Sequence, residues 1–170
     1  MFLSKLDVMV FSVTVVKLPK MGKSEIEKLL QEQMLCRIAF KGDKYPYMAP
    51  FQYILMGGFL YFHFTNYGKK MKLLEKEKRV CVEIEDYKPD LSEYNFVVLR
   101  GELEVVRDPQ ERAKAIKKMG KEGKQKLSTN FLAAHGFKKE EGWSSFTPER
   151  PVVIVKLKQV IEEIGLKSPE

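Results

Sequence analysis

The sequence predicts a mainly β protein: a small antiparallel β-barrel with short helices at its ends. Several apolar segments have the length of strands, and a Gly57-Gly58 turn joins two of them as a hairpin. Successive hairpins favour antiparallel pairing, and short helices between strands suit a closed barrel. No repeat or linker is present, so we expect one domain over 21–170, with residues 1–20 as an extension packed on it.

Residues 6–16, LDVMVFSVTVV, form the first apolar run. Asp7 interrupts this run, no small-residue cleavage pattern follows it, and it is too short to span a bilayer. We therefore expect a strand or an ordered lead-in rather than a signal segment. The expected location is cytoplasmic, with no role for a membrane.

Three helices are expected from their start signals. The first, over about 24–33, begins with a capping-box pattern of Ser24 and Glu27. The second opens at Gly68 and runs to about 75. The third begins at Asp108, is followed by proline at the first helical position and glutamate at the third, and carries to about 119.

The predicted strands cover 35–40, 45–56, 59–65, 79–86, 94–106 and 152–160. Pro46 and Pro50 cannot donate to a sheet, so the second strand is expected to be an edge, bulged or kinked. Gly101 marks a bulge in the fifth. Residues 120–150, which contain several glycines and prolines, are the least regular part of the chain.

The formal net charge is +7 and the pI is about 9.3. Such a surface attracts polyanions, although a solvated coat of lysines is the simpler interpretation. The lysines are densest in 112–139, whereas the aromatic residues of 59–64 lie in an apolar strand. A nucleic-acid-binding barrel would place exposed aromatics among basic residues, so we do not expect nucleic acid as a partner.

The two cysteines, Cys36 and Cys81, lie far apart in the sequence. No CxxC pattern is present, and no metal site is expected. Both residues lie in apolar, strand-like runs. They are therefore predicted to be buried free thiols in a reducing compartment.

The stretch 61–70, YFHFTNYGKK, has the clearest chemical meaning. A strand ends, hydroxyl and amide side chains follow, and a glycine then precedes Lys69 and Lys70 at a helix start. Unpaired N–H groups at a helix N-terminus and two ammonium groups attract an anion, and Thr65 adds a hydroxyl donor. The stretch predicts a phosphate-binding corner. The alternative is an exposed helical turn with solvated lysines.

Alternation along the same strand places His63 on the face of Thr65. The opposite face carries Leu60, Phe62 and Phe64. His63 is therefore either a cofactor contact near the phosphate corner or an ordinary polar residue at a sheet edge. The pattern suggests no role for His135.

Five short segments follow one another in a characteristic order: RIAF at 37–40, YPYMAPFQY at 45–53, LYFH at 60–63, GKK at 68–70 and VIEEIGLK at 160–167. Over about 21–167 the chain resembles the pyridoxamine 5'-phosphate oxidase-like FMN-binding split-barrel family. It is most similar to the nitroimidazole-reductase-like branch. Each piece alone is a weak signal, and their order and spacing make the resemblance specific.

The resemblance implies an FMN-binding split β-barrel that forms a homodimer, with two FMN sites at the subunit interface. Lys69 and Lys70 would bind the FMN phosphate, with Thr65 at the ribityl-phosphate. The strand at 48–52 would run along the isoalloxazine, partly through its backbone, with His63 near the flavin. The expected cofactor-binding residues are Met48, Ala49, Pro50, Phe51, Gln52, His63, Phe64, Thr65, Lys69, Lys70 and Trp143.

Two features differ from the pyridoxamine phosphate oxidases themselves. Their Arg-x-x-x-Leu-Lys element corresponds here to MAPFQY, which has no basic residue. Their C-terminal tryptophan and arginine pattern is also missing, because Trp143 and Arg150 stand in a different context. Pyridoxal phosphate synthesis is therefore not expected. Trp143 is either an ordinary packing residue or a lid over the partner's flavin.

The expected function is electron transfer by FMN, from a reduced nicotinamide to a small acceptor. No catalytic residue is named, because the cofactor carries the chemistry and the protein binds, orients and tunes it. The alternative is a flavin or deazaflavin carrier or sensor without robust turnover. A homodimer is also expected because a partner would cover the apolar residues Phe131, Phe137, Trp143 and Phe146.

Overall fold

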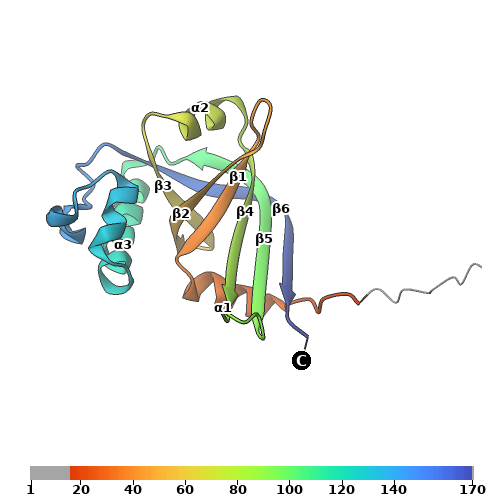
Figure 1. The fold of residues 1–170 in the computed structure, drawn as a ribbon. Coiled ribbons are helices and arrows are strands. Elements are labelled where there is room, and N and C mark those ends of the chain that lie inside the picture. Colours follow the sequence, from red (N-terminus) through yellow and green to blue (C-terminus); the bar gives the residue numbers. More distant parts are fainter. Residues whose placement is uncertain (1–15, 170) are drawn as a thin grey trace, which may run out of the picture.

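The computed structural model describes residues 16–169, and within them the strands close into an antiparallel barrel of order β1-β2-β3-β6-β5-β4 (Figure 1). The expected fold class is confirmed. The run at 6–16 and most of the expected N-terminal extension lie outside the described residues. In chain order the elements are α1 Lys23–Glu32, β1 Leu35–Phe40, β2 Tyr47–Met56, β3 Phe59–Thr65, α2 Lys69–Lys76, β4 Arg79–Tyr87, β5 Tyr94–Val105, α3 Pro109–Lys126, three 3₁₀ turns η1 Thr129–His135, η2 Lys139–Glu141 and η3 Trp143–Ser145, and β6 Val152–Lys167.

Helix α1 begins one residue before Ser24, and the expected capping box of Ser24 and Glu27 is wrong. Glu25 caps the helix instead, because its carboxylate accepts from the backbone N–H of Gly22 at 2.6 Å. Gly22 occupies the capping position, so Ser24 already lies in the first turn. The carboxylate of Glu25 also accepts from Lys167 Nζ at 2.8 Å, which ties α1 to the end of β6.

The barrel interior is built from alternating apolar residues, as the sequence predicts. Its fully buried members include Ile38, Phe62, Phe64, Val82, Ile84 and Val97. Gly57 and Gly58 both have positive φ, and they close the β2–β3 hairpin as expected. Helices α1 and α2 lie at opposite ends of this barrel (Figure 1).

Strand β6 extends well past residue 160, where the sequence suggested its end. Gly101 of β5 lies opposite a bulge in β6, and the pairing register shifts between Arg100 and Glu102. A Cβ at Gly101 would come 2.7 Å from the carbonyl oxygen of Lys158. Gln159 takes a positive φ of 48° within the bulge. The bulge thus lets one strand turn and continue past residue 160, where the sequence predicted its end.

Strand β2 changes neighbours halfway along its length. Residues 47–52 pair with β1, whereas residues 53–56 pair with β3. On the other side of the hairpin, β3 leaves β2 after Phe62 and pairs with β6 up to Thr65. The half of β2 that contains Pro50 is therefore unpaired toward β3. The edge character expected for this strand is confined to that half.

Helix α3 does not end near residue 119, and its glycines are the reason that its length was underestimated. A Cβ at Gly123 would lie 2.4 Å from Trp143 Cζ3, and one at Gly120 would lie 3.2 Å from the carbonyl oxygen of Phe146. These glycines allow close packing within a continuous helix. The segment after α3 folds back against them through its 3₁₀ turns.

Helix α3 and residues 127–146 form an outer layer on the barrel. A second apolar cluster lies between this outer layer and the outer face of β3 and β6. It buries Phe137, Trp143 and Phe146 within the chain, with Phe131 half-buried beside them. These four residues were expected to be covered by a partner subunit, and that reason for a homodimer is wrong. The chain covers them itself because residues 127–146 pack on α3.

Arg112 of α3 fixes the loop that leads into β6. Its guanidinium donates to the backbone carbonyl of Pro148 at 2.8 Å, of Arg150 at 2.8 Å and of Val152 at 3.0 Å. One planar donor fork therefore binds three backbone carbonyls at once. The loop before β6 is held against the start of α3.

The cysteines differ in environment. Cys36 is buried, and burial raises the pKa of its thiol far above the ordinary range. Cys81 is exposed, contrary to the expectation that both would be buried. Its neighbours Val80 and Val82 take the inward positions of β4, so the alternation places Cys81 on the outer face.

Candidate functional site

The N-terminus of α2 lies over the unpaired half of β2. Gly68 precedes the helix with a φ of 94°, a conformation that glycine adopts readily. Lys69 Nζ then lies 4.7 Å from the ring centroid of Tyr47, and Lys70 Nζ lies 4.9 Å from that of Phe51. The fold thus brings together two segments that the sequence singled out separately, the strand at 48–52 and the Gly-Lys-Lys element.

This corner carries uncompensated positive charge. Among the described residues, no carboxylate forms an ion pair with Lys69 or Lys70, and the first turn of α2 has no acidic residue. Partial burial lowers the pKa of Lys70. Thr65 lies at the end of β3, where its hydroxyl donates to the carbonyl of Tyr67 at 2.9 Å. Helix N–H groups and two ammonium groups therefore converge where a phosphate would be stabilised.

The predicted strand residues point in different directions. Met48 and Pro50 are exposed on the outer face, and Ala49 is half-buried. Phe51 faces the barrel interior, where its ring stacks on Phe64 at 4.9 Å between centroids. Gln52 points toward α3. The side chains of Phe51 and Phe64 are therefore core residues, and a flavin along this strand would meet chiefly its backbone and the outward side chains.

Gln52 is buried, and only one end of its amide has a partner in the chain. Its Nε2 donates to the carbonyl of Met119 at 3.3 Å, whereas its Oε1 has no partner. A buried amide oxygen without a donor is costly. Within β2, it is the buried side-chain polar atom without a partner, and it lies on the strand that the resemblance assigns to the flavin.

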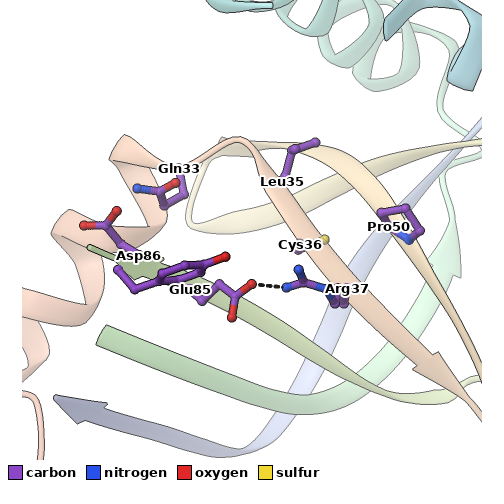
Figure 2. A pocket seen from close by; sticks show the side chains of 8 residues that line it. Gln33, Leu35, Cys36, Arg37, Pro50, Glu85 and Asp86 are labelled. Atoms are coloured by element: carbon purple, nitrogen blue, oxygen red, sulfur yellow. Dashed lines mark hydrogen bonds and ion pairs between the residues drawn. The ribbon is translucent and has the colours of Figure 1, made fainter. Parts of the chain in front are cut away.

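A groove of about 300 Å³ runs along the outer face of β1 beside Pro50 (Figure 2). Leu35 and Tyr87 form part of its apolar lining. Arg37 is its basic residue, and its guanidinium bonds to the carboxylate of Glu85 (Figure 2). The same guanidinium also bonds to the carboxylate of Glu83. Because both carboxylates neutralise Arg37, this groove lacks the free positive charge that a phosphate needs.

His63 lies on the other side of β3, under the outer layer. Its Nδ1 is 2.9 Å from Nδ1 of His135, the last residue of η1. Only 6% of His63 and 5% of His135 is exposed. Phe146 packs against both rings, with centroids 5.5 Å from His63 and 5.2 Å from His135. The structure thus gives His135, for which the sequence suggested no role, a direct partner.

Both histidines are neutral at physiological pH. Burial, followed by the nearby charges of His135 and Lys70, lowers the pKa of His63 to about 3. Burial and Lys70 lower the pKa of His135 to about 4. The Nε2 atom of each ring is buried without a protein partner. Neutral imidazoles of this kind donate and accept hydrogen bonds, but they do not supply protons at neutral pH.

A polar cavity of about 150 Å³ lies beside the histidine pair. His63 and His135 line it together with Thr65 and Arg150, whose guanidinium is paired with Glu141. Thr65 also belongs to the lysine corner. The cavity and the corner therefore adjoin each other at the end of β3.

Trp143 lies apart from the corner. Its ring is 5% exposed, packs on Gly123 and donates through Nε1 to the carbonyl of Leu127 at 3.1 Å. Of the two roles considered for it, packing is the one that these contacts support. The signal that would have indicated this is the Gly120 and Gly123 spacing on one helix face.

The sequence pattern that defines the pyridoxamine 5'-phosphate oxidase family matches residues 22–140, which is more than half of the chain. The chain belongs to this family. The resemblance carried by the sequence pieces is therefore confirmed, and the match includes the β2 strand, the Gly-Lys-Lys corner and His135. No curated protein sequence matches this member of the family.

Solved structures with the same fold are distant in sequence. An FAD-binding protein from Mesorhizobium loti superposes with a TM-score of 0.65 at 19% identity, covering 91% of this chain and 100% of its own. An FAD-binding protein from Mycobacterium smegmatis gives 0.61 at 17% identity, with coverages of 88% and 97%. A candidate 5-nitroimidazole antibiotic resistance protein from Bacteroides thetaiotaomicron gives 0.57 at 18% identity, with coverages of 92% and 98%. These similarities establish the split-barrel fold of the oxidase family.

Across residues 16–169, no group of three or more histidine, cysteine or acidic side chains is arranged to hold a metal ion. Within the same part of the chain, no helix is both long and apolar enough to cross a membrane.

Proposed function

We propose that this protein binds FMN at the Lys69–Lys70 corner and passes electrons from a reduced nicotinamide to a small acceptor. The observation that carries the proposal is the pair of lysines without carboxylate partners at the N-terminus of α2, beside the unpaired half of β2. Family membership and the FAD-binding proteins that share the fold support a flavin as the ligand.

The residues present fit such a cofactor. Lys70, with Lys69 assisting, would hold the phosphate, and Thr65 would contact the ribityl-phosphate. The backbone of residues 48–52 is open toward β3 and is available to hydrogen-bond the edge of the ring system. The Oε1 of Gln52 adds an acceptor that has no partner in the chain. Bound FMN would supply hydride and electron transfer, and the protein would position it and exclude water.

Titration with FMN tests the proposal. We expect quenching of flavin fluorescence and a rise in melting temperature, with FMN released from the purified protein. A parallel titration with FAD decides between the two flavins. The absence of quenching and of any thermal shift with either flavin would contradict the proposal.

We also propose a homodimer, on different grounds from those that the sequence suggested. The outer face of β1, β2 and β4 exposes apolar side chains, among them Leu35, Met48 and Tyr87. Met48 is 61% exposed, and Tyr87, which lines the groove beside Arg37, is 50% exposed. A second copy on this face would cover them and enclose a flavin that lies along β2.

Light scattering tests the dimer. We expect the wild type to be dimeric at micromolar concentration, and Met48→Asp to weaken the dimer. Val160→Asp, on the exposed bulge of β6, serves as a control. A flavin-loaded protein that remains monomeric would contradict the proposal.

A carrier or sensor without robust turnover is the second candidate. The observation that favours it is the low pKa of both His63 and His135, because neither histidine then supplies a proton at neutral pH. Oxidation of a reduced nicotinamide by the flavin-loaded protein distinguishes the two functions. Steady turnover supports the oxidoreductase, and flavin binding without turnover supports the carrier.

A further inference from the structure

A cavity of about 390 Å³ opens on the outer face of the barrel, at the bulge between β5 and β6. Gly101 lines it without a side chain, and Gln159 lines it with a backbone φ of 48°. Ile161, two residues further along β6, also lines the cavity and is 78% exposed. Bulges often re-aim side chains beside binding sites, and the volume is in the range that small ligands occupy.

The uncharged lining residues are mainly apolar. Ala39 and Cys81 are partners in the β1–β4 register, and both face outward because their neighbours along each strand fill the barrel. Pro46, in the loop before β2, and Ile161 add exposed apolar surface. Leaving such a surface in water is unfavourable, so the cavity suits an apolar occupant.

The guanidinium groups of the lining are already compensated. Arg79 donates through Nε and Nη2 to the carboxylate of Glu77, at 2.9 Å and 2.6 Å. Arg100 donates through Nη1 to the carboxylate of Glu162 at 2.8 Å. The two other charged side chains of the lining, a lysine and a glutamate, have opposite signs. The cavity therefore has little net charge to offset the hydration that a charged ligand would lose.

We propose that this cavity binds a small uncharged aromatic molecule. Guanidinium groups and sulfur atoms make favourable contacts with aromatic rings, and Arg79, Arg100 and Cys81 supply both kinds of group. The volume has room for two fused rings. The lining residues are different from those of the lysine corner and of the cavity beside the histidines, so the proposal does not rest on FMN binding.

Cys81 reports occupation of the cavity directly. It is exposed, whereas Cys36, the other cysteine of the chain, is buried, so iodoacetamide should alkylate Cys81 first. We expect 2-naphthylmethanol, an uncharged two-ring aromatic, to slow this alkylation, with half-protection below about 1 mM. Its carboxylate counterpart, 2-naphthoate, should need about tenfold more, because both guanidinium groups already have partners. The saturated analogue, decahydro-2-naphthylmethanol, should need about fivefold more, because it cannot stack. Mass spectrometry of the alkylated peptide measures each rate.

Ile161→Asn removes an apolar side chain of the lining and should raise the concentration of 2-naphthylmethanol for half-protection about tenfold. Val160→Asn is the matched control, because Val160 is the neighbouring exposed residue of the bulge and is not among the lining residues. It should leave protection unchanged. Thermal unfolding checks that both variants fold, and Ile161→Ala replaces Ile161→Asn if the latter does not.

Several results would overturn the proposal. One is unchanged alkylation of Cys81 at 1 mM 2-naphthylmethanol, and another is equal protection by 2-naphthoate. An equal effect of the substitutions at Ile161 and Val160 would place the ligand elsewhere. Slower alkylation of Cys81 at high than at low protein concentration, without any added probe, would show instead that a second copy of the chain fills the cavity.

Discussion

Nδ1 of His63 lies 2.9 Å from Nδ1 of His135, so one proton lies between the two rings that join β3 to the outer layer. If both rings were protonated, each Nδ1 would carry a proton and the hydrogen bond would be lost. Two cations would then lie together in an apolar site that Lys70 already makes positive. The contact is therefore lost once both rings are protonated.

Stability is expected to fall below pH 6.5. In the unfolded chain each histidine is protonated near its ordinary pKa of 6.5. In the folded chain protonation occurs only near pH 4 for His135 and near pH 3 for His63. The contribution of the neutral pair to folding stability is therefore complete above pH 6.5 and is lost as pH falls toward 4. At pH 5 the loss is about 2 kcal/mol per histidine. Urea unfolding from pH 8 to pH 4.5 measures it. The double variant His63→Phe/His135→Phe should show a flatter profile, and an equally steep one would refute the assignment.

Lys70→Ala is expected to weaken FMN binding by roughly 10- to 150-fold, because a charge-assisted bond to phosphate contributes about 1.5–3 kcal/mol. Riboflavin lacks the phosphate, so its affinity should barely change. Fluorescence titration with both flavins separates loss of a phosphate contact from damage to the fold. Lys72→Ala, exposed on the same helix, is the matched control and should bind FMN as the wild type does. Equal losses for both flavins would show that Lys70 does not hold the phosphate.

Gly123→Ala is expected to destabilise the protein by about 1–3 kcal/mol, because the added Cβ would overlap the ring of Trp143. At an open helical position the same change would stabilise by about 1 kcal/mol, so the sign of the effect is informative. Thermal unfolding followed by tryptophan fluorescence measures it. Lys124→Ala, on the exposed side of α3, should leave stability nearly unchanged. A stabilised Gly123→Ala protein would mean that the helix and the tryptophan do not meet.

Arg112→Lys is expected to cost about 1–3 kcal/mol, although the charge is kept. A lysine cannot reach the carbonyls of Pro148, Arg150 and Val152 together. Hydrogen exchange should show faster exchange at residues 147–152, with the barrel strands unchanged. Arg107→Lys, an exposed position just before α3, provides the comparison. Unchanged exchange in the loop would show that charge, not the shape of the donor, is what matters there.

The barrel could be predicted from the sequence because each strand has a local signal, either alternating apolar residues or a glycine turn. Alternation identified the inward residues of β3, such as Phe62 and Phe64, and the two glycines identified the β2–β3 hairpin. The Asp108 cap of α3 was also predictable, and its side chain accepts from the N–H groups of Gln110 and Glu111. These signals act over a few residues and do not depend on tertiary contacts.

The length of α3, the end of β6 and the role of His135 could not be predicted, because each depends on contacts between segments that are distant in the sequence. Gly123 looked like a helix breaker, and only the position of Trp143 shows that it is a packing site. The continuation of β6 past residue 160 depends on Gly101 across the sheet. His135 carried no local signal, because its partner His63 lies 72 residues earlier in the chain. The positive charge of the lysine corner was predictable, but its position over β2 was not.

Strand β3 has no side that faces water along most of its length. Leu60, Phe62 and Phe64 fill the barrel, while Tyr61 and His63 lie under the outer layer. An ordinary barrel strand accepts polar replacements at every second position, but here nearly every position is enclosed. Random mutagenesis of this protein should therefore find every position from 60 to 64 intolerant of polar replacement, whereas β4 should tolerate it at alternate positions.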